Sequence, residues 1–236
     1  MKKSKRYQKV AELVDKDKIY SLTDAVSTVK KTATAKFDET INISIRLGID
    51  TKQPDQLVRA SVTLPHGTGK TPRILVFAKG EKEKEAKEAG ADLIGAEELY
   101  ERISKGFCDF DIAVSTPDLM REVGKLGKIL GPKGLMPNPK SGTVTFDIKK
   151  IVKDFKTGKI EYKTDVSGVI HVRIGKASMS EKQILDNVHA LIDGVLRAKP
   201  ASAKGIYIEG ITLSSTMGPG IKIDTKEFLK KMGTGS

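Results

Sequence analysis

The sequence predicts an α/β protein of two domains, one inserted into the other. Strands in which apolar and polar residues alternate precede and follow a central block, where short, continuously apolar strands alternate with helices. Alternation is typical of a strand with one face in solvent. Apolar runs separated by helices are typical of a parallel sheet covered on both faces. The host domain is predicted at 1–67 and 160–236, and the inserted domain at 68–159.

Two helices and an alternating strand are predicted at the start of the chain. Residues 5–14 and 21–31 have apolar positions at helical spacing, and Ser21 followed by Asp24 resembles a capping box with Asp in place of Glu. The stretch INISIRLGI after Phe37 alternates strictly. One side of it carries Ile41, Ile43, Ile45 and Leu47, and the other carries Asn42, Ser44 and Arg46. This pattern predicts a half-buried strand.

A second alternating stretch, LVRASVTL at 57–64, follows the turn DTKQPDQ. We expect the two strands to pair across this turn. The punctuated segment PHGTGKTP at 65–72 comes next and is interpreted as a flexible linker into the inserted domain.

The central block changes to alternating strands and helices. Strands are predicted at 73–78, 91–96 and 111–115, and helices at 80–90, at 96–105 and from Pro117. Farther on, the stretch LGKILGPKGLMPNPK at 126–140 holds three glycines and three prolines. That density forbids a regular helix or central strand, so a shaped loop is predicted.

The alternating pattern returns in KIEYKTD and GVIHVRIG, from residue 159 onward. A long amphipathic helix is predicted from Ser180 to Ala198, followed by a last strand in GIYIEGITLSS. The terminal MGTGS is rich in Gly, Ser and Thr without an apolar anchor and is predicted to be disordered.

The charge balance favours an anionic partner. Lys and Arg number 42 against 30 Asp and Glu, a formal net charge of +12, which suits nucleic acid, a membrane surface or an acidic protein. No apolar run is long enough to cross a membrane, and the basic N-terminus lacks the apolar segment of a signal peptide. The absence of Trp disfavours a wide base-stacking platform. The lone Cys108 fits a reducing cytoplasm and is expected to be a buried structural thiol.

Catalytic, cofactor and metal motifs are lacking. GTGKT at 67–71 imitates the end of a phosphate-binding loop, but Leu64 stands where its first glycine belongs, and a strand follows instead of a helix. No dinucleotide fingerprint follows the strand at 73–78. His66, His171 and His189 lie far apart, and no Cys/His cluster has zinc spacing. We therefore expect no enzyme, no cofactor and no metal.

Three segments of the host domain carry candidate binding residues. KFDET at 36–40 precedes a strand, HVRIGKASMS at 171–180 ends a strand where a helix begins, and TLSSTMGPG at 212–220 ends another strand in small residues. Free N–H groups at a helix start attract anions. Small residues let an RNA backbone approach, and hydroxyls can bond phosphate or 2′-OH groups.

Taken together, these segments resemble the bacterial large-subunit ribosomal protein L-one family. The resemblance covers nearly the whole chain and is carried by KFDETINISIRLGID, VRASVTLPHGTGK, VFAKGEKEKEAKEAGAD, LGKILGPKGLMPNPKSGTV, IHVRIGKASM and STMGPGIKID. It implies a split α+β host domain with an antiparallel-rich sheet, and an inserted Rossmann-like three-layer α/β/α domain.

The resemblance also implies the function and its residues. The host domain would bind large-subunit rRNA and form the mobile stalk beside the tRNA exit site, together with other large-subunit components. It would assist release of deacylated tRNA and, as a translational repressor, bind its own operon mRNA. The protein would be cytoplasmic, ribosome-associated and monomeric when free. The implied contacts are Lys36, Phe37, Thr40, His171, Gly175, Lys176, Ser178, Ser215, Thr216, Met217 and Gly218, with Lys128 and Lys133 as secondary ones. Where relatives often carry Phe, this chain has Met179, which replaces stacking by a softer apolar contact.

The residues alone leave two other classes of function open. One is a nucleotide-binding enzyme with its site in the inserted domain, and the other is an adaptor for acidic proteins. The first predicts thermal stabilisation by nucleotide, and the second predicts binding that RNA does not compete away.

Overall fold

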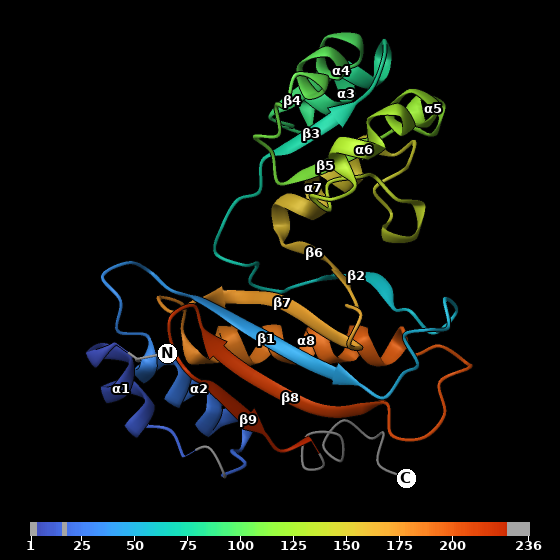
Figure 1. Ribbon diagram of the computed structural model, residues 1–236. Helices are drawn as coiled ribbons and strands as arrows, with labels where there is room; N and C mark the ends of the chain where they lie inside the picture. Colours follow the sequence, from blue (N-terminus) through green and yellow to red (C-terminus); the bar gives the residue numbers. More distant parts are fainter. Residues whose placement is uncertain (1–3, 16–17, 226–236) are drawn as a thin grey trace. The chain divides into compact units, whose positions relative to one another are not determined.

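The computed structural model describes residues 4–15 and 18–225. The chain divides into two compact units, one made of Met1–Gly69 with Glu161–Ser236 and the other of Lys70–Ile160 (Figure 1). Both units mix helices and strands, so the predicted α/β class is confirmed. The terminal MGTGS lies outside the described residues.

A four-stranded antiparallel sheet forms the centre of the first unit. Its order is β7 (Val169–Lys176), β1 (Thr40–Leu47), β8 (Ile208–Ser215) and β9 (Gly220–Ile223). Strand β1 alternates as predicted, with its four apolar side chains buried and its polar ones turned outward. The strand β9, which the sequence pattern did not predict, extends the sheet beyond β8.

The expected pairing of the stretch 57–64 with β1 is wrong. Strand β2 (Arg59–Thr63) pairs instead with β6 (Lys159–Lys163) in a separate two-stranded sheet. Both edges of β1 are already occupied, by β7 and β8. The first four residues of β2 are half-buried and Thr63 is exposed, so neither side of the strand is fully buried; this strand packs against α8 (Glu181–Arg197), outside the main sheet.

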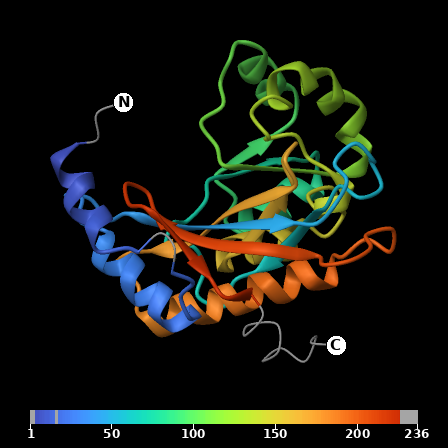
Figure 2. The same ribbon diagram turned by 60° about the horizontal axis from the view of Figure 1, so that its bottom comes forward.

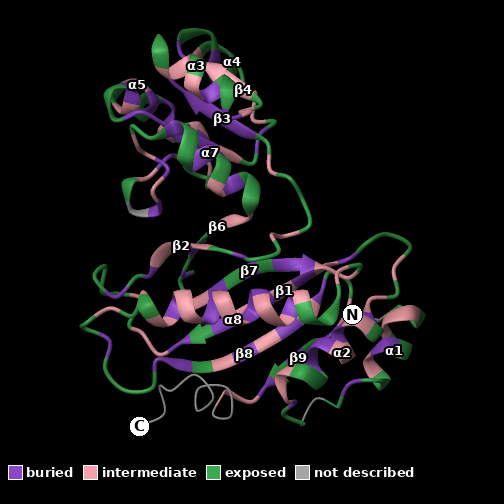
Figure 3. Ribbon diagram, turned by 180° about the vertical axis from the view of Figure 1, so that it is seen from behind, coloured by how far each residue is buried: buried purple, intermediate pink, exposed green. Residues whose placement is uncertain are grey.

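Two helices cover one face of the four-stranded sheet. Helix α2 (Leu22–Thr32) packs against β8 and β9, while α8 (Glu181–Arg197) packs against β7 and against α2 (Figures 2 and 3). The long helix predicted from Ser180 is confirmed as α8, and Ser180 and Gln183 form a reciprocal capping box at its start. At the start of α2, the Ser21 side chain accepts the backbone N–H of Asp24. A shorter helix, α1 (Lys5–Glu12), precedes them.

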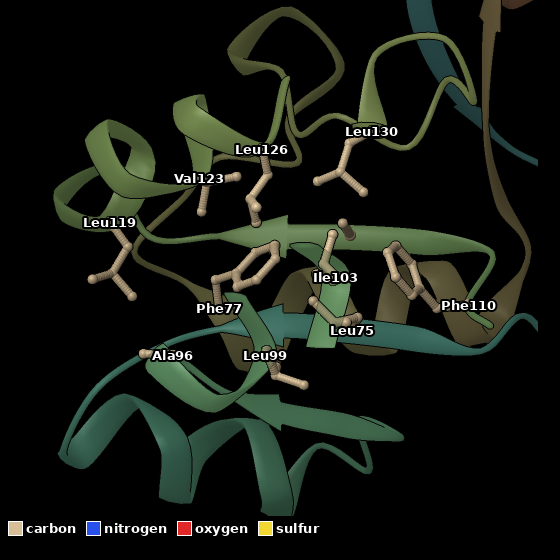
Figure 4. Packing of buried hydrophobic residues seen from close by; sticks show 11 residues of the cluster. Leu75, Phe77, Ala96, Leu99, Ile103, Phe110, Leu119, Val123, Leu126 and Leu130 are labelled. Carbon is tan, nitrogen blue, oxygen red and sulfur yellow. The ribbon is translucent and has the colours of Figure 1, made fainter. Parts of the chain in front are cut away.

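The second unit contains a three-stranded parallel sheet. Its order is β4 (Leu93–Gly95), β3 (Ile74–Phe77) and β5 (Ile112–Ser115). All four residues of β3 are fully buried, and alternate ones point to opposite sides. Leu75 and Phe77 pack on one side, with residues of α4 (Glu97–Ser104) and of the segment 117–130 (Figure 4).

The other side of this sheet is covered as well. Ile74 and Val76 pack against α3 (Glu81–Glu88) and α7 (Ile148–Thr157), a helix that the sequence pattern did not predict. The prediction of a parallel sheet covered on both faces is therefore confirmed.

The glycine- and proline-rich stretch is less irregular at its start than expected. After β5 the chain forms a series of short turns, namely the 3₁₀ turns Pro117–Leu119, Gly124–Leu126 and Pro139–Ser141, with α5 (Met120–Val123) and α6 (Gly127–Leu130). The expectation of no helix is thus wrong for Gly127–Leu130. Leu126 and Leu130 are buried in the cluster of Figure 4, and this packing offsets the poor helix propensity of the glycines.

Among the described residues, no helix is long and apolar enough to cross a bilayer. The same residues contain no cluster of three or more His, Cys, Asp or Glu side chains placed to hold a metal ion. Cys108 is half-buried rather than fully buried.

Candidate nucleic-acid interface

Three distant segments of the chain meet at one end of the four-stranded sheet. Strand β1 begins there at Thr40, which pairs with Lys176 at the end of β7. On the other side, Ile41 pairs with Ser215 at the end of β8. The sheet register therefore brings the segments 36–40, 175–178 and 215–218 together.

A buried carboxylate organises this end of the sheet. Glu39 is 1% exposed, and its two oxygens accept the backbone N–H groups of Ala35, at 2.8 Å, and Met217, at 2.9 Å. Burial alone raises the pKa of Glu39. The hydrogen bonds from Met217 and Ala35, the Ser215 hydroxyl and the charge of Arg6 outweigh it and lower the pKa below its ordinary value of 4.5. The group is therefore an ionised anchor for two loops.

Arg6 of α1 contacts both the Glu39 carboxylate and the turn after β8. Its guanidinium lies 3.9 Å from the Glu39 carboxylate and donates to the Met217 carbonyl at 3.0 Å and to the Thr34 hydroxyl at 3.3 Å. Sequence reasoning missed both Arg6 and Glu39. Neither belongs to a local pattern, because their partners lie up to 211 residues away.

The turn after β8 is fixed by Thr216 and Gly218. The Thr216 hydroxyl accepts the backbone N–H of Thr40 at 3.0 Å and donates to the Thr40 carbonyl at 3.2 Å. The N–H of Gly218 bonds the Ser215 carbonyl at 3.2 Å, and a Cβ at Gly218 would overlap the Ser215 hydroxyl. Glycine is required here by this close approach. The O–H group of Thr216, the only hydrogen-bond donor of its side chain, is therefore already used inside the protein.

Lys176 and Ser178 are linked to the loop before β1. The Lys176 ammonium donates to the Thr40 hydroxyl at 3.0 Å and to the Asp38 carbonyl at 3.2 Å. Ser178 donates both its backbone N–H, at 3.0 Å, and its hydroxyl, at 2.8 Å, to the Asp38 carboxylate. Met179 lies half-buried against the backbone, where a Cβ on Gly175 would press on its sulfur.

The residues implied by the resemblance differ in exposure. Phe37 is 55% exposed and Met217 48%, while Lys36, Ser178 and Thr216 are also exposed. In contrast, Ser215 is 3% exposed and Gly175 is buried, so these two act inside the protein.

Three of the implied contacts lie outside this cluster. His171 sits farther along β7, where its Nδ1 lies 3.0 Å from the Ser44 hydroxyl and its Nε2 lies 3.6 Å from Asp165. Lys128 and Lys133 belong to the second unit, where both are exposed.

The helix starts that follow β3 and β4 in the second unit are acidic. The first turns of α3 and α4, which follow β3 and β4, carry Glu81, Glu83, Glu97 and Glu98. Lys79, the basic residue after β3, pairs with Glu97 at 2.9 Å. Carboxylates thus occupy the helix starts at which an anion would otherwise bind.

Comparison with known families supplies an independent finding. Residues 29–219 match the model of the Ribosomal protein L1p/L10e family. This range contains every implied contact named above.

Proposed function

Since the chain belongs to the Ribosomal protein L1p/L10e family, we propose that the end of its four-stranded sheet binds large-subunit rRNA. Membership makes the chain a large-subunit ribosomal protein. The observation that carries the proposed site is the pair of exposed apolar side chains, Phe37 and Met217, on loops that one buried carboxylate holds in place.

Binding at this site would be selective for RNA shape and would involve no catalytic step. Phe37 and Met217 would pack against sugar and base faces, where an apolar surface replaces water. Lys36 and Lys176 would supply the salt-dependent attraction to phosphates. Ser215, Gly175 and Gly218 would shape the turns from within, and the lone pair left on the Thr216 hydroxyl could accept a 2′-OH.

We also propose the finer role that the resemblance implies. The protein would form the mobile stalk at the tRNA exit site, contact deacylated tRNA on its way out, and repress translation by binding its own operon mRNA. Lys128 and Lys133 would add secondary RNA contacts. The family supports a ribosome-associated place in the cytoplasm, and the free protein would be monomeric.

Footprinting of the purified protein on large-subunit rRNA tests this proposal. We expect protection confined to one folded site, and an mRNA carrying the repressor site should compete for the same protein. Protection scattered over many rRNA helices, or binding of an acidic protein that rRNA does not displace, would contradict the proposal. Competition by rRNA but not by the mRNA would remove only the repressor role.

A further inference from the structure

Met217 places an exposed thioether within the proposed rRNA site. It stands in the turn after β8, between Thr216 and Gly218, and its side chain is exposed. A thioether that faces solvent is open to peroxides, which convert methionine to its sulfoxide, whereas a covered sulfur is shielded from them. The position that exposes this side chain to RNA therefore exposes it to an oxidant as well.

The other methionines that the structure describes are better covered. Met120, Met136 and Met179 are half-buried. Met136 packs against the buried cluster of Figure 4, in the second unit. The sulfur of Met179 accepts the backbone N–H of Lys176 at 3.3 Å, which engages a lone pair that an oxidant would attack. Among the described residues, Met217 is therefore the methionine most open to oxidation.

The turn holds Met217 in place through both of its backbone polar groups. Its N–H donates to the Glu39 carboxylate at 2.9 Å, and its carbonyl accepts from the Arg6 guanidinium at 3.0 Å. Withdrawing the side chain from the surface would break the hydrogen bond to a carboxylate that is 1% exposed. Because such a loss is costly, a chemical change at the sulfur acts on the bound RNA rather than on the turn.

We propose that Met217 is an oxidation site at which hydrogen peroxide turns off rRNA binding, an inference that rests on the proposed function. A lone pair of the sulfur forms the new S–O bond, the O–O bond breaks, and water leaves. The thioether is thus oxidised to the sulfoxide, and the peroxide is reduced. Methionine sulfoxide reductases reverse the change: two thiols are oxidised to a disulfide, and the oxygen leaves as water.

The sulfoxide weakens binding because it puts a polar group on an apolar contact surface. In the proposed complex Met217 and Phe37 pack against sugar and base faces. The S=O group binds water in the free protein, and it must give up this water against RNA surfaces that offer it no matching donor. The effect also runs in the other direction, since RNA that covers Met217 shields its sulfur from peroxide.

Peroxide treatment of the full-length protein tests the proposal. Wild type and Met217→Leu, an apolar variant of similar volume without sulfur, are treated at a dose that leaves the Tm unchanged. Peptide mass spectrometry locates the added oxygen, and each protein is titrated with the protected rRNA fragment before and after treatment. We expect treatment to lower the affinity of wild type roughly tenfold, and that of Met217→Leu by less than about twofold.

Met179→Leu is the matched control, because it removes the half-buried sulfur beside Lys176 and keeps Met217. Its affinity should fall on treatment as much as that of wild type. A methionine sulfoxide reductase with a dithiol should restore the affinity of both. In protein mixed with the rRNA fragment before treatment, oxidation of Met217 should slow down, while that of Met136 should keep its rate.

Two results would overturn the inference. One is an equal loss of affinity in treated wild type and treated Met217→Leu. The other is unchanged affinity of wild type in which Met217 carries the oxygen, or no oxygen at Met217 when Met136 is oxidised. If untreated wild type binds no rRNA site, the proposed function fails. If untreated protein binds and oxidation of Met217 has no effect, the proposed function stands and this inference alone is wrong.

Discussion

The backbone N–H of Met217 donates to the buried carboxylate of Glu39 at 2.9 Å, across 178 residues of sequence. The other oxygen of the same carboxylate accepts the N–H of Ala35. One anion thus holds the turn that presents Met217 and the loop that presents Phe37. Because the carboxylate itself is 1% exposed, it influences RNA only through these loops.

We expect Glu39→Gln to weaken both folding and rRNA binding. The amide replaces one acceptor oxygen by an N–H₂ group, so that either Ala35 or Met217 faces a donor. An unsatisfied buried donor costs about 1–3 kcal/mol. Denaturant unfolding and RNA titration measure the two effects. Glu161→Gln, which removes a partly exposed pair with Arg59, is the control and should cost less than about 1 kcal/mol. Unchanged RNA affinity in folded Glu39→Gln would show that the loops need no such anchor.

The lowered pKa of Glu39 also predicts a pH dependence. A carboxylate whose pKa is lower in the folded than in the unfolded protein stabilises the fold above the unfolded value and loses that contribution as the pH falls through the folded one. Wild-type stability should therefore decline below about pH 4.5. The decline should be shallower in Glu39→Gln. The free energy of unfolding is measured for both proteins between pH 7 and pH 3. If it falls by the same amount in wild type and in Glu39→Gln, this prediction is wrong.

We expect Thr216 to contribute to rRNA affinity through the hydrogen bonds of its hydroxyl rather than through the volume of its side chain. Thr216→Val keeps the volume but loses both hydrogen bonds to the Thr40 backbone, whereas Thr216→Ser can keep them. We expect rRNA affinity to fall roughly tenfold to a hundredfold in the valine variant, or on the order of 1.4–2.8 kcal/mol. The serine variant should stay close to wild type. Equal affinities of folded valine and wild-type proteins would remove Thr216 from the site.

Lys176→Ala should change the salt dependence of RNA binding more than its strength at low salt. The ammonium is held over the loop before β1 by Thr40 and Asp38, at the point where the proposed site begins. Losing one phosphate contact should reduce the slope of log K against log salt by about one. Lys150→Ala, an exposed lysine of α7, is the matched control. Identical slopes in both variants would place Lys176 outside the RNA footprint.

Local patterns predicted the elements of the fold better than their partners. The alternation of Ile41, Ile43 and Ile45 identified β1 and its buried face, because a side-chain period of two is a property of the strand itself. The same alternation cannot say which strand lies beside it. For that reason β2 was expected beside β1, although β7 and β8 occupy both of its edges.

The exposed residues of the proposed site could be predicted from the sequence, but the charged residues that hold their loops in place could not. Phe37, Thr216 and Met217 stand in short segments whose resemblance to a family marked them. Arg6 and Glu39 act through contacts across more than 170 residues, and neither charge has a local spacing that distinguishes it from other surface charges. The meeting of the segments 36–40, 175–178 and 215–218 at one end of the sheet likewise depends on strand register, which composition does not encode.

Asn187 should hold the chain where it leaves the first unit. This buried side chain of α8 accepts the backbone N–H of His66 at 3.1 Å and donates to the carbonyls of Gly67 and Ile174 at 2.8 Å. The first part of the expected flexible linker is therefore anchored. In addition, Ile174 is the residue that the register of β7 against β1 skips, so its carbonyl relies on Asn187.

Asn187→Ala should destabilise the protein by on the order of 2–3 kcal/mol, because the buried carbonyl of Ile174 and two partly buried backbone groups, the His66 N–H and the Gly67 carbonyl, lose their partner. Hydrogen exchange should speed up at the His66 amide, and proteolysis should become faster within 65–72. Asn42→Ala removes a half-buried amide that makes one 3.4 Å hydrogen bond, and it should cost far less. If both variants unfold at the same denaturant concentration while exchange at His66 stays slow, Asn187 does not anchor the exit, and the turn at 64–67 holds itself through the bond from Gly67 N–H to the Leu64 carbonyl.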